Sequence, residues 1–174
     1  GDPGWFRALA TEEGIASLNT HQWNTDKALW QPALLYWSCW RASKVGFAQL
    51  HEEMKKYVDD PRRRWLECVR VKRGLADTSR PGGFAKDQSA WDGLVRILYH
   101  RNSIPFRHLF ASKASLEHLE AQAPCIDPAA RGVVLPFFVR EEEEYRARLE
   151  AIADDNFLSL SPPTPSSLPL SARP

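Results

Sequence analysis

Basic side chains are concentrated in the segment 61–86, where their spacing suits the binding of an anion. Eight basic residues stand there against only Glu67 and Asp77, so the local net charge is +6. Because the segment ends in a loop rich in glycine and proline, it predicts a site for a carboxylate or an acidic peptide. Arg62–Arg64 are more simply a solvated helix face. The better candidates flank the loop and are Arg73, Arg80 and Lys86.

Two adjacent carboxylates, Glu12 and Glu13, are the second feature that could do chemistry. They lie in the sequence TEEGIASL, where Thr11 is expected to cap a helix whose first turn holds both glutamates. Carboxylates in a first turn interact favourably with the helix dipole, which is the common reason for finding them there. The residues alone therefore leave a structural role and a ligand role open.

No complete metal site or activated nucleophile is predicted from the remaining residues. The run HEEMK, beginning at His51, starts like the zinc-protease helix motif H-E-x-x-H, but Lys55 replaces the second histidine. A lysine ammonium at that position would repel a metal ion. No cysteine pair has metal-binding spacing, and Cys39 and Cys68 fall on apolar helix faces, where they are expected to be structural.

Helices are expected to position these residues, because apolar side chains recur at helical spacing along the chain. Gln31-Pro32 and Asp60-Pro61 each place proline in a first turn, as helix starts prefer. The segment 77–83 is predicted to be a loop, and the run 133–139 is the only candidate strand. The fold class is therefore predicted to be mainly α. Helices are expected at 12–18, 32–43, 45–58, 61–75, 91–99, 106–110, 116–122 and 138–156.

The apolar stripes predict which helix faces are buried. The helix at 32–43 is apolar nearly all round and should be enclosed. The helix at 61–75 should turn Trp65, Cys68 and Val69 inward. The inner faces of three further helices are expected to carry Phe47, Leu50, Met54 and Val58, then Trp91, Leu94, Val95, Leu98 and Tyr99, and finally Tyr145, Leu149 and Ile152.

Composition restricts the class of protein. With 174 residues, 43% apolar residues and 26% charged residues, the chain matches one ordinary globular domain. Its net charge of +1 argues against a nucleic-acid binder, and no apolar run reaches the roughly 18 residues of a membrane span. Three distant cysteines and the lack of a signal peptide favour an intracellular protein.

A change in composition divides the chain in two. Residues 159–174 contain five prolines and five serines, too few apolar groups to offset the entropy of ordering. We expect a disordered tail over 159–174 and a folded body over 1–158.

Several segments together resemble the microtubule-associated tyrosine carboxypeptidase family, the eukaryotic branch of a group named for a QEGLA motif. TEEGIASLNT is similar to the family's TEEGLASL segment. The resemblance continues through LWQPALLYWSCWRASKVGFAQL, DPRRRWLECVRVKRGLADTS, PGGFAKDQSAWDGLVRIL and YHRNSIPF. It covers about residues 9–123, in order and without large gaps.

The resemblance implies a helical, zincin-like zinc peptidase that removes the C-terminal tyrosine of α-tubulin. Zinc would be held by two histidines and a glutamate, with a second glutamate as general base. Aligning QEGLA with EEGIA puts the glutamine at Glu12 and the zinc ligand at Glu13. The implied partners are α-tubulin tails on cytoplasmic microtubules, with neither nucleic acid nor membrane. Residues expected to face the substrate's carboxylates are Arg73 and Lys86, with Arg70, Lys72 and Arg80 as further candidates.

Two departures from the family pattern bear on activity. The H-E-x-x-x-H helix, which would carry the other two ligands and the general base, is absent and is expected upstream. The chain therefore looks like the C-terminal half of a catalytic domain, inactive by itself. Ala90 stands where the K-D-x-x-Y pattern has tyrosine. These departures leave a second interpretation, a non-catalytic helical module that binds microtubules or acidic tails.

Overall fold

The computed structural model describes residues 4–158 and builds them from helices. The α-helices are α1 (Gly4–His21), α2 (Trp30–Ala42), α3 (Phe47–Glu53), α4 (Pro61–Lys72), α5 (Ser89–His100), α6 (Phe106–Ala111), α7 (Leu116–Gln122), α8 (Phe137–Arg140) and α9 (Glu142–Asp155). Short 3-10 helices are η1 (Met54–Lys56), η2 (Ala85–Gln88) and η3 (Ala123–Cys125). No strand occurs between residues 4 and 158, so the prediction of a mainly α fold is confirmed.

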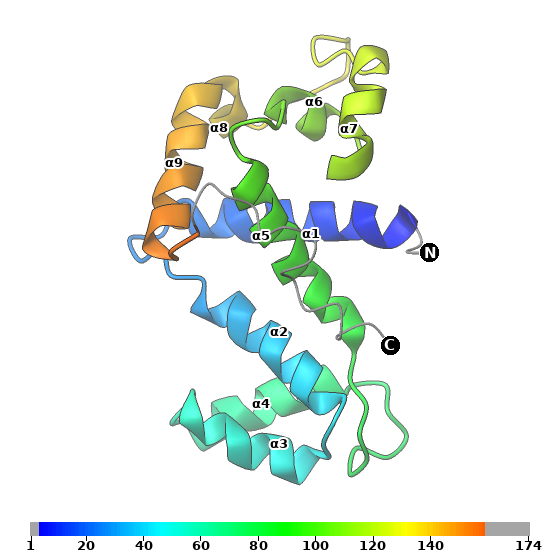
Figure 1. The fold of residues 1–174 in the computed structure, drawn as a ribbon, viewed down its shortest axis with the longest axis vertical. Coiled ribbons are helices and arrows are strands. Elements are labelled where there is room, and N and C mark those ends of the chain that lie inside the picture. Colours follow the sequence, from blue (N-terminus) through cyan, green and yellow to red (C-terminus); the bar gives the residue numbers. More distant parts are fainter. Residues whose placement is uncertain (1–3, 159–174) are drawn as a thin grey trace.

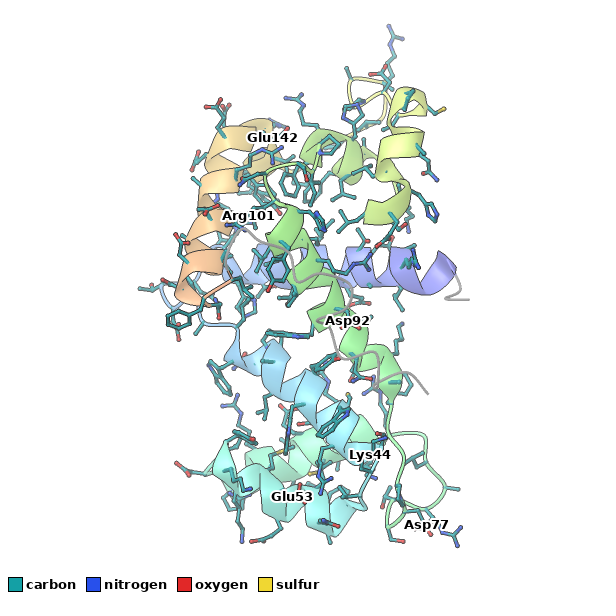
Figure 2. All side chains as sticks on the ribbon, viewed as in Figure 1. Lys44, Glu53, Asp77, Asp92, Arg101 and Glu142 are labelled. Atoms are coloured by element: carbon teal, nitrogen blue, oxygen red, sulfur yellow. The ribbon has the colours of Figure 1, made fainter. Side chains whose placement is uncertain are left out.

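The helices form two groups, each around its own apolar core (Figure 1). The lower lobe, residues 30–88, packs α2, α3 and α4 around Leu50, Met54 and Cys68. The upper lobe, residues 4–29 and 89–158, packs α1 and α5–α9 around a larger core that includes Leu98 and Tyr145. Helix α5 begins beside the lower lobe, directly after η2, and runs into the upper lobe (Figure 1). Figure 2 shows the side chains that fill both groups.

Two glycines allow α1 and α5 to cross with their backbones in contact. A Cβ atom on Gly93 would lie 1.7 Å from the carbonyl oxygen of Ala10, and one on Gly14 would lie 2.3 Å from the carbonyl carbon of Gly93. No larger side chain fits such an approach without moving one helix. The crossing holds Glu13, the neighbour of Gly14, close to the start of α5.

Helix α1 begins well before the expected start, so the prediction that Thr11 caps it is wrong. Thr11 lies within the helix and is 2% exposed. Its hydroxyl donates to the carbonyl of Arg7 at 3.0 Å and accepts from the backbone N–H of Leu116 at 3.2 Å. A threonine that bonds back along its own helix needs no role as a cap. Glu12 and Glu13 are therefore mid-helix residues.

Helix α4 starts as predicted but turns a different face inward. The Asp60 carboxylate accepts from the backbone N–H of Arg62 at 2.9 Å, with Pro61 in the first turn. Trp65 and Val69, expected to be buried, are 55% and 45% exposed, whereas Cys68 is buried as predicted. The other inward residues of α4 are Arg64, Val71 and Lys72.

The remaining expectations are confirmed in large part. Helix α2 follows the predicted bounds, although Trp30 and Trp40 are exposed, so it is not enclosed all round. Helices α6 and α7 lie where expected, and the last predicted helix is interrupted at Glu141 into α8 and α9. Most residues of the three predicted inner faces are buried, namely Leu50, Met54, Val58, Leu94, Leu98, Tyr145, Leu149 and Ile152. The others are half-buried and are Phe47, Trp91, Val95 and Tyr99.

The candidate strand at 133–139 is wrong. Gly132 turns the chain with a φ of 91°, and Pro136 immediately precedes α8, so the run cannot extend into a paired strand. Val134, in its middle, is 84% exposed. Within residues 4–158, no helix combines the length and apolar character needed to cross a membrane. The tail predicted at 159–174 lies outside the described residues.

Candidate functional site

A cavity of about 220 Å³ lies where α1, the end of α4, η2 and the start of α5 meet. Four of the six predicted site residues line it, although they come from three separate elements. Because Glu13 belongs to the upper lobe and the basic residues to the lower, the cavity lies between the two cores. Its lining is Glu13, Arg70, Arg73, Phe84, Lys86, Asp87, Ser89 and Ala90.

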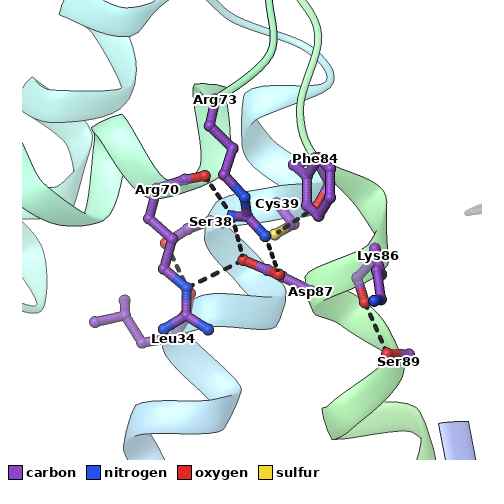
Figure 3. Close-up of polar contacts among 9 residues, drawn as sticks. All are labelled: Leu34, Ser38, Cys39, Arg70, Arg73, Phe84, Lys86, Asp87 and Ser89. Atoms are coloured by element: carbon purple, nitrogen blue, oxygen red, sulfur yellow. Dashed lines mark hydrogen bonds and ion pairs between the residues drawn. The ribbon is translucent and has the colours of Figure 1, made fainter. Parts of the chain in front are cut away.

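Asp87 forms hydrogen bonds with both arginines that line this cavity (Figure 3). Its carboxylate accepts from Arg70 Nε at 3.0 Å and from both terminal nitrogens of Arg73 at 2.7 and 2.6 Å. The Arg73 guanidinium also lies 3.7 Å from the centroid of the Phe84 ring. Burial raises the pKa of Asp87, but the hydrogen bonds from Arg73 and Arg70 outweigh it and hold that pKa below its ordinary value.

These bonds leave the basic residues with unequal capacity for a ligand. Arg73 also donates to the carbonyl of Arg70 at 2.6 Å, so most of its N–H groups are engaged. By contrast, the terminal nitrogens of Arg70 and the ammonium of Lys86 have no hydrogen-bond partner among residues 4–158. Arg70 and Lys86 therefore present the available positive charge, and Arg73 is part of the wall that holds Arg70.

The two neighbouring glutamates of α1 point to different surroundings. Glu12 forms an ion pair with Lys113 at 3.4 Å, away from the cavity. Glu13 is exposed into the cavity, and its carboxylate has no ion pair or hydrogen bond within the described part of the chain. The cavity therefore holds one carboxylate and two cations. Such a set can bind a ligand that carries both charges, or an anion joined to the carboxylate through a metal ion.

Two of the predicted substrate-binding residues are not in the cavity. Lys72 is 1% exposed, and its ammonium donates to the carbonyl oxygens of Ala42, Val45 and Arg80 at 3.0, 2.5 and 2.8 Å. The expectation that Lys72 faces a substrate is therefore wrong, because its donors are consumed inside the lower lobe. The Arg80 side chain is 81% exposed and pairs with Asp77 at 3.2 Å, outside the cavity lining.

Sequence reasoning missed the roles of Asp87 and Phe84. Phe84 is half-buried, and its ring lies against the guanidinium of Arg73. Lys86-Asp87 could equally be a helix-capping pair by its sequence. Asp87 lies 14 and 17 residues from its arginine partners, so no short-range spacing marks the contact.

A complete metal site is not found in the described residues. No group of three or more histidine, cysteine, aspartate or glutamate side chains gathers anywhere in residues 4–158. In the run from His51, Glu52 pairs with Lys55 and Glu53 with Arg41, each at 2.6 Å. The described residues fit a zinc ion only through Glu13, as one ligand of a set whose other members must come from elsewhere.

The two buried cysteines are structural, as expected. Cys39 and Cys68 are both free and buried. Burial raises the pKa of Cys39 to about 12 and that of Cys68 to about 11, so both thiols stay protonated near neutral pH. A protonated thiol is neither a nucleophile nor a metal ligand.

Comparison with known proteins finds relatives over most of the chain. Microtubule-associated tyrosine carboxypeptidase 1 of Mus musculus is 42% identical over 156 residues, which cover 87% of this chain and 32% of that protein. The Homo sapiens protein of the same name is 42% identical with the same coverage. Putative tyrosine carboxypeptidase MATCAP2 of Mus musculus is 39% identical over 150 residues, 86% of this chain and 28% of that protein. No protein-family profile matches the chain. The chain thus spans about a third of the length of the curated relatives it matches.

Proposed function

Because the chain is homologous over most of its length to a segment of the microtubule-associated tyrosine carboxypeptidases, we propose that it forms part of a zinc carboxypeptidase. The proposed reaction removes the C-terminal tyrosine of an α-tubulin tail on cytoplasmic microtubules. This chain would contribute one metal ligand and the groups that hold the acidic end of the substrate. The relatives' names support the carboxypeptidase class, and the charged residues of the cavity support the zinc and tubulin assignments.

The observation that carries the proposal is that one cavity contains Glu13, Arg70 and Lys86. A carboxypeptidase must recognise a free terminal carboxylate, and a tubulin tail adds acidic side chains before it. The free donors of Arg70 and Lys86 suit such carboxylates, since hydrogen bonds between two charged groups are about twice as strong as neutral ones. Asp87 keeps the two arginines from separating by bonding to both.

The Glu13 carboxylate is the group on this chain that would hold zinc. It comes from the middle of α1, beside the backbone contact between Gly14 and Gly93, so a rigid element fixes its position. A zinc ion bound there would supply Lewis-acid activation of the scissile carbonyl and of a water molecule. The residues of this chain bind and orient the peptide end, and Phe84 and Ala90 add apolar wall for its last side chain.

Tyrosine release by the full-length protein tests the role of Glu13. We expect Glu13→Gln to lower the release of tyrosine from microtubules by roughly a hundredfold or more, because a neutral amide is a poor zinc ligand. Glu12→Gln is the matched control, since Glu12 pairs with Lys113 outside the cavity, and it should retain activity. Equal activity of Glu13→Gln and the unsubstituted protein would remove Glu13 from the mechanism.

One observation favours a second candidate function, a module that binds acidic tails without cleaving them. Ala90 lines the cavity at the position where the resemblance expects tyrosine, so a hydroxyl is missing from the wall. Salt-sensitive microtubule binding with no tyrosine release would support this function. Release of tyrosine that depends on Glu13 would exclude it.

A further inference from the structure

The outward face of α4 carries a line of arginines that ends at the cavity described above. Because an α-helix turns by about 100° per residue, residues that are four, seven and eight apart lie on one side of it. Cys68 and Val71 of α4 face the core of the lower lobe. The opposite side carries an arginine stripe, which we define as Arg62, Arg63, Leu66 and Arg70.

Arg70 belongs both to the stripe and to the cavity. It lines the cavity, and its side chain is about half exposed. Its terminal nitrogens lie on the side of the guanidinium that points away from Asp87 (Figure 3). Since the stripe lies on one unbroken helix, its length is fixed. Arg62 and Arg63 precede Arg70 by eight and seven residues, which is roughly 10–12 Å along the helix axis.

The stripe presents guanidinium groups that the fold leaves unpaired. The Arg62 side chain is exposed and has no hydrogen bond or ion pair among residues 4–158. The Arg63 guanidinium lies 4.8 Å from the centroid of the Trp30 ring, and in the same part of the chain it also has no hydrogen bond or ion pair. Glu67, the one carboxylate of α4, is half-buried and pairs with neither arginine. The N–H groups of both guanidinium groups are therefore available to a ligand.

The positions of Arg62 and Arg63 do not help α4 to form. Both lie in its first turn, directly after the Asp60 cap. The first turn is the positive end of the helix dipole, where carboxylates stabilise a helix and cations destabilise it. An anionic ligand would be attracted both by the two arginines and by the dipole behind them.

We propose that the arginine stripe binds acidic side chains of a peptide whose C-terminus occupies the cavity lined by Glu13, Arg70 and Lys86. This inference rests on the proposed function, because it takes the cavity as the site of the peptide end. The planar guanidinium of arginine can bind both oxygens of a carboxylate at once. An extended peptide advances about 3.3 Å per residue, so the roughly 10–12 Å from Arg70 to the start of the stripe corresponds to about three or four residues. The acidic residues are therefore expected roughly four to six positions before the C-terminus.

Fluorescence anisotropy with the 174-residue chain and two labelled fourteen-residue peptides tests the proposal. Both peptides consist of glycine and serine apart from one pair of glutamates and a C-terminal Glu-Tyr, so their compositions and charges are equal. The glutamate pair lies four and five positions before the end in the near-pair peptide, and eleven and twelve positions before it in the far-pair peptide. We expect the near-pair peptide to bind about fivefold more tightly, which is the upper range for one exposed ion pair.

Charge reversal separates the stripe from general attraction between a basic surface and an acidic peptide. Arg62→Glu combined with Arg63→Glu should abolish the advantage of the near-pair peptide. Both glutamates would lie in the first turn of α4, where the helix dipole favours them, so unfolding cannot explain the loss. Lys44→Glu combined with Arg80→Glu is the matched control. It changes the net charge equally at exposed side chains outside the stripe and the cavity, so the advantage should remain.

The other outcomes would overturn the proposal in distinguishable ways. Equal binding of the two peptides, weakened for both by Lys86→Met, would reject the stripe and leave the proposed function standing. An advantage that survives the reversal of Arg62 and Arg63 would assign the acidic side chains to another part of the chain. No binding of either peptide would reject both the stripe and the cavity as a site for a peptide end.

Discussion

The two lobes use their basic side chains for different purposes. In the upper lobe, acidic residues outnumber basic ones, 14 to 10 over residues 4–29 and 89–158. Helix α9 supplies partners for the arginines there. Arg101 binds Glu150 at 2.5 Å, and Arg146 binds Glu142 at 2.5 Å.

In the lower lobe the ratio is reversed, and basic residues cannot all find carboxylates. Arg64 and Lys72 turn inward and donate to backbone carbonyls, including those of Val58 and Ala42. Within residues 4–158, Arg70 and Lys86 keep hydrogen-bond donors without a partner at the cavity. Whether a basic side chain stabilises the fold or remains available to bind a ligand therefore depends on the hydrogen-bond acceptors near it, and not on whether it is lysine or arginine.

The largest expected effect comes from the crossing of α1 and α5 within the upper lobe. Gly93→Ala places a methyl group 1.7 Å from the Ala10 carbonyl oxygen, so α1 and α5 must separate. We expect a loss of about 3 kcal/mol or more in the free energy of unfolding, measured by urea denaturation. Gly74→Ala is the contrast, because Gly74 has a φ of +82° but nothing within 4 Å, and backbone strain alone should cost about 1–2 kcal/mol. Equal losses would show that the close crossing is not formed.

The next effect separates structural from ligand-binding cations within the lower lobe. Lys72→Met leaves three buried carbonyl oxygens without their donor and should lower the free energy of unfolding by about 3 kcal/mol. Arg70→Met removes an exposed side chain and should change it by less than about 0.5 kcal/mol while weakening peptide binding. If Arg70→Met proved the more destabilising of the two, the division of roles would be wrong.

The smallest effect concerns Asp92, which lies on α5 between the lobes (Figure 2). Burial raises the pKa of Asp92 from 3.8 to about 6, with Arg96 partly opposing the change. A carboxyl with a raised pKa in the folded protein stabilises below its unfolded pKa, and that contribution is lost as pH rises through 6. The free energy of unfolding should therefore fall by about 2 kcal/mol between pH 4 and 7, and Asp92→Asn should remove that fall. Thermal unfolding across pH would measure it, and an unchanged profile in the variant would contradict it.

Local signals in the sequence predicted the helices and most of their inner faces. Asp60-Pro61 fixed the start of α4 because capping depends on adjacent residues. The face of α4 was harder to predict, because apolar residues also occur on protein surfaces. Trp65 and Val69 are predicted to be buried because they are apolar. Instead Lys72 is buried, because its ammonium donates hydrogen bonds to backbone carbonyls inside the lower lobe.

The candidate site was predicted in part for a similar reason. Glu13, Arg70, Arg73 and Lys86 were identified, and the fold brings them to one cavity. Lys72 lies only two residues from Arg70, yet two residues of helix rotate a side chain by about 200°. Which of the two reaches the cavity depends on partners from α2 and η2, and no spacing along the chain records those contacts.

The most direct test of the account compares peptides that differ only at the C-terminus. Anisotropy titrations would use the 174-residue chain and acidic peptides ending in Glu-Tyr, with a free carboxylate or with an amide. We expect the peptide with the free carboxylate to bind about tenfold more tightly, and Arg70→Met combined with Lys86→Met to remove the difference. Equal affinity for the two peptides would contradict the assignment of this cavity to the end of a peptide chain.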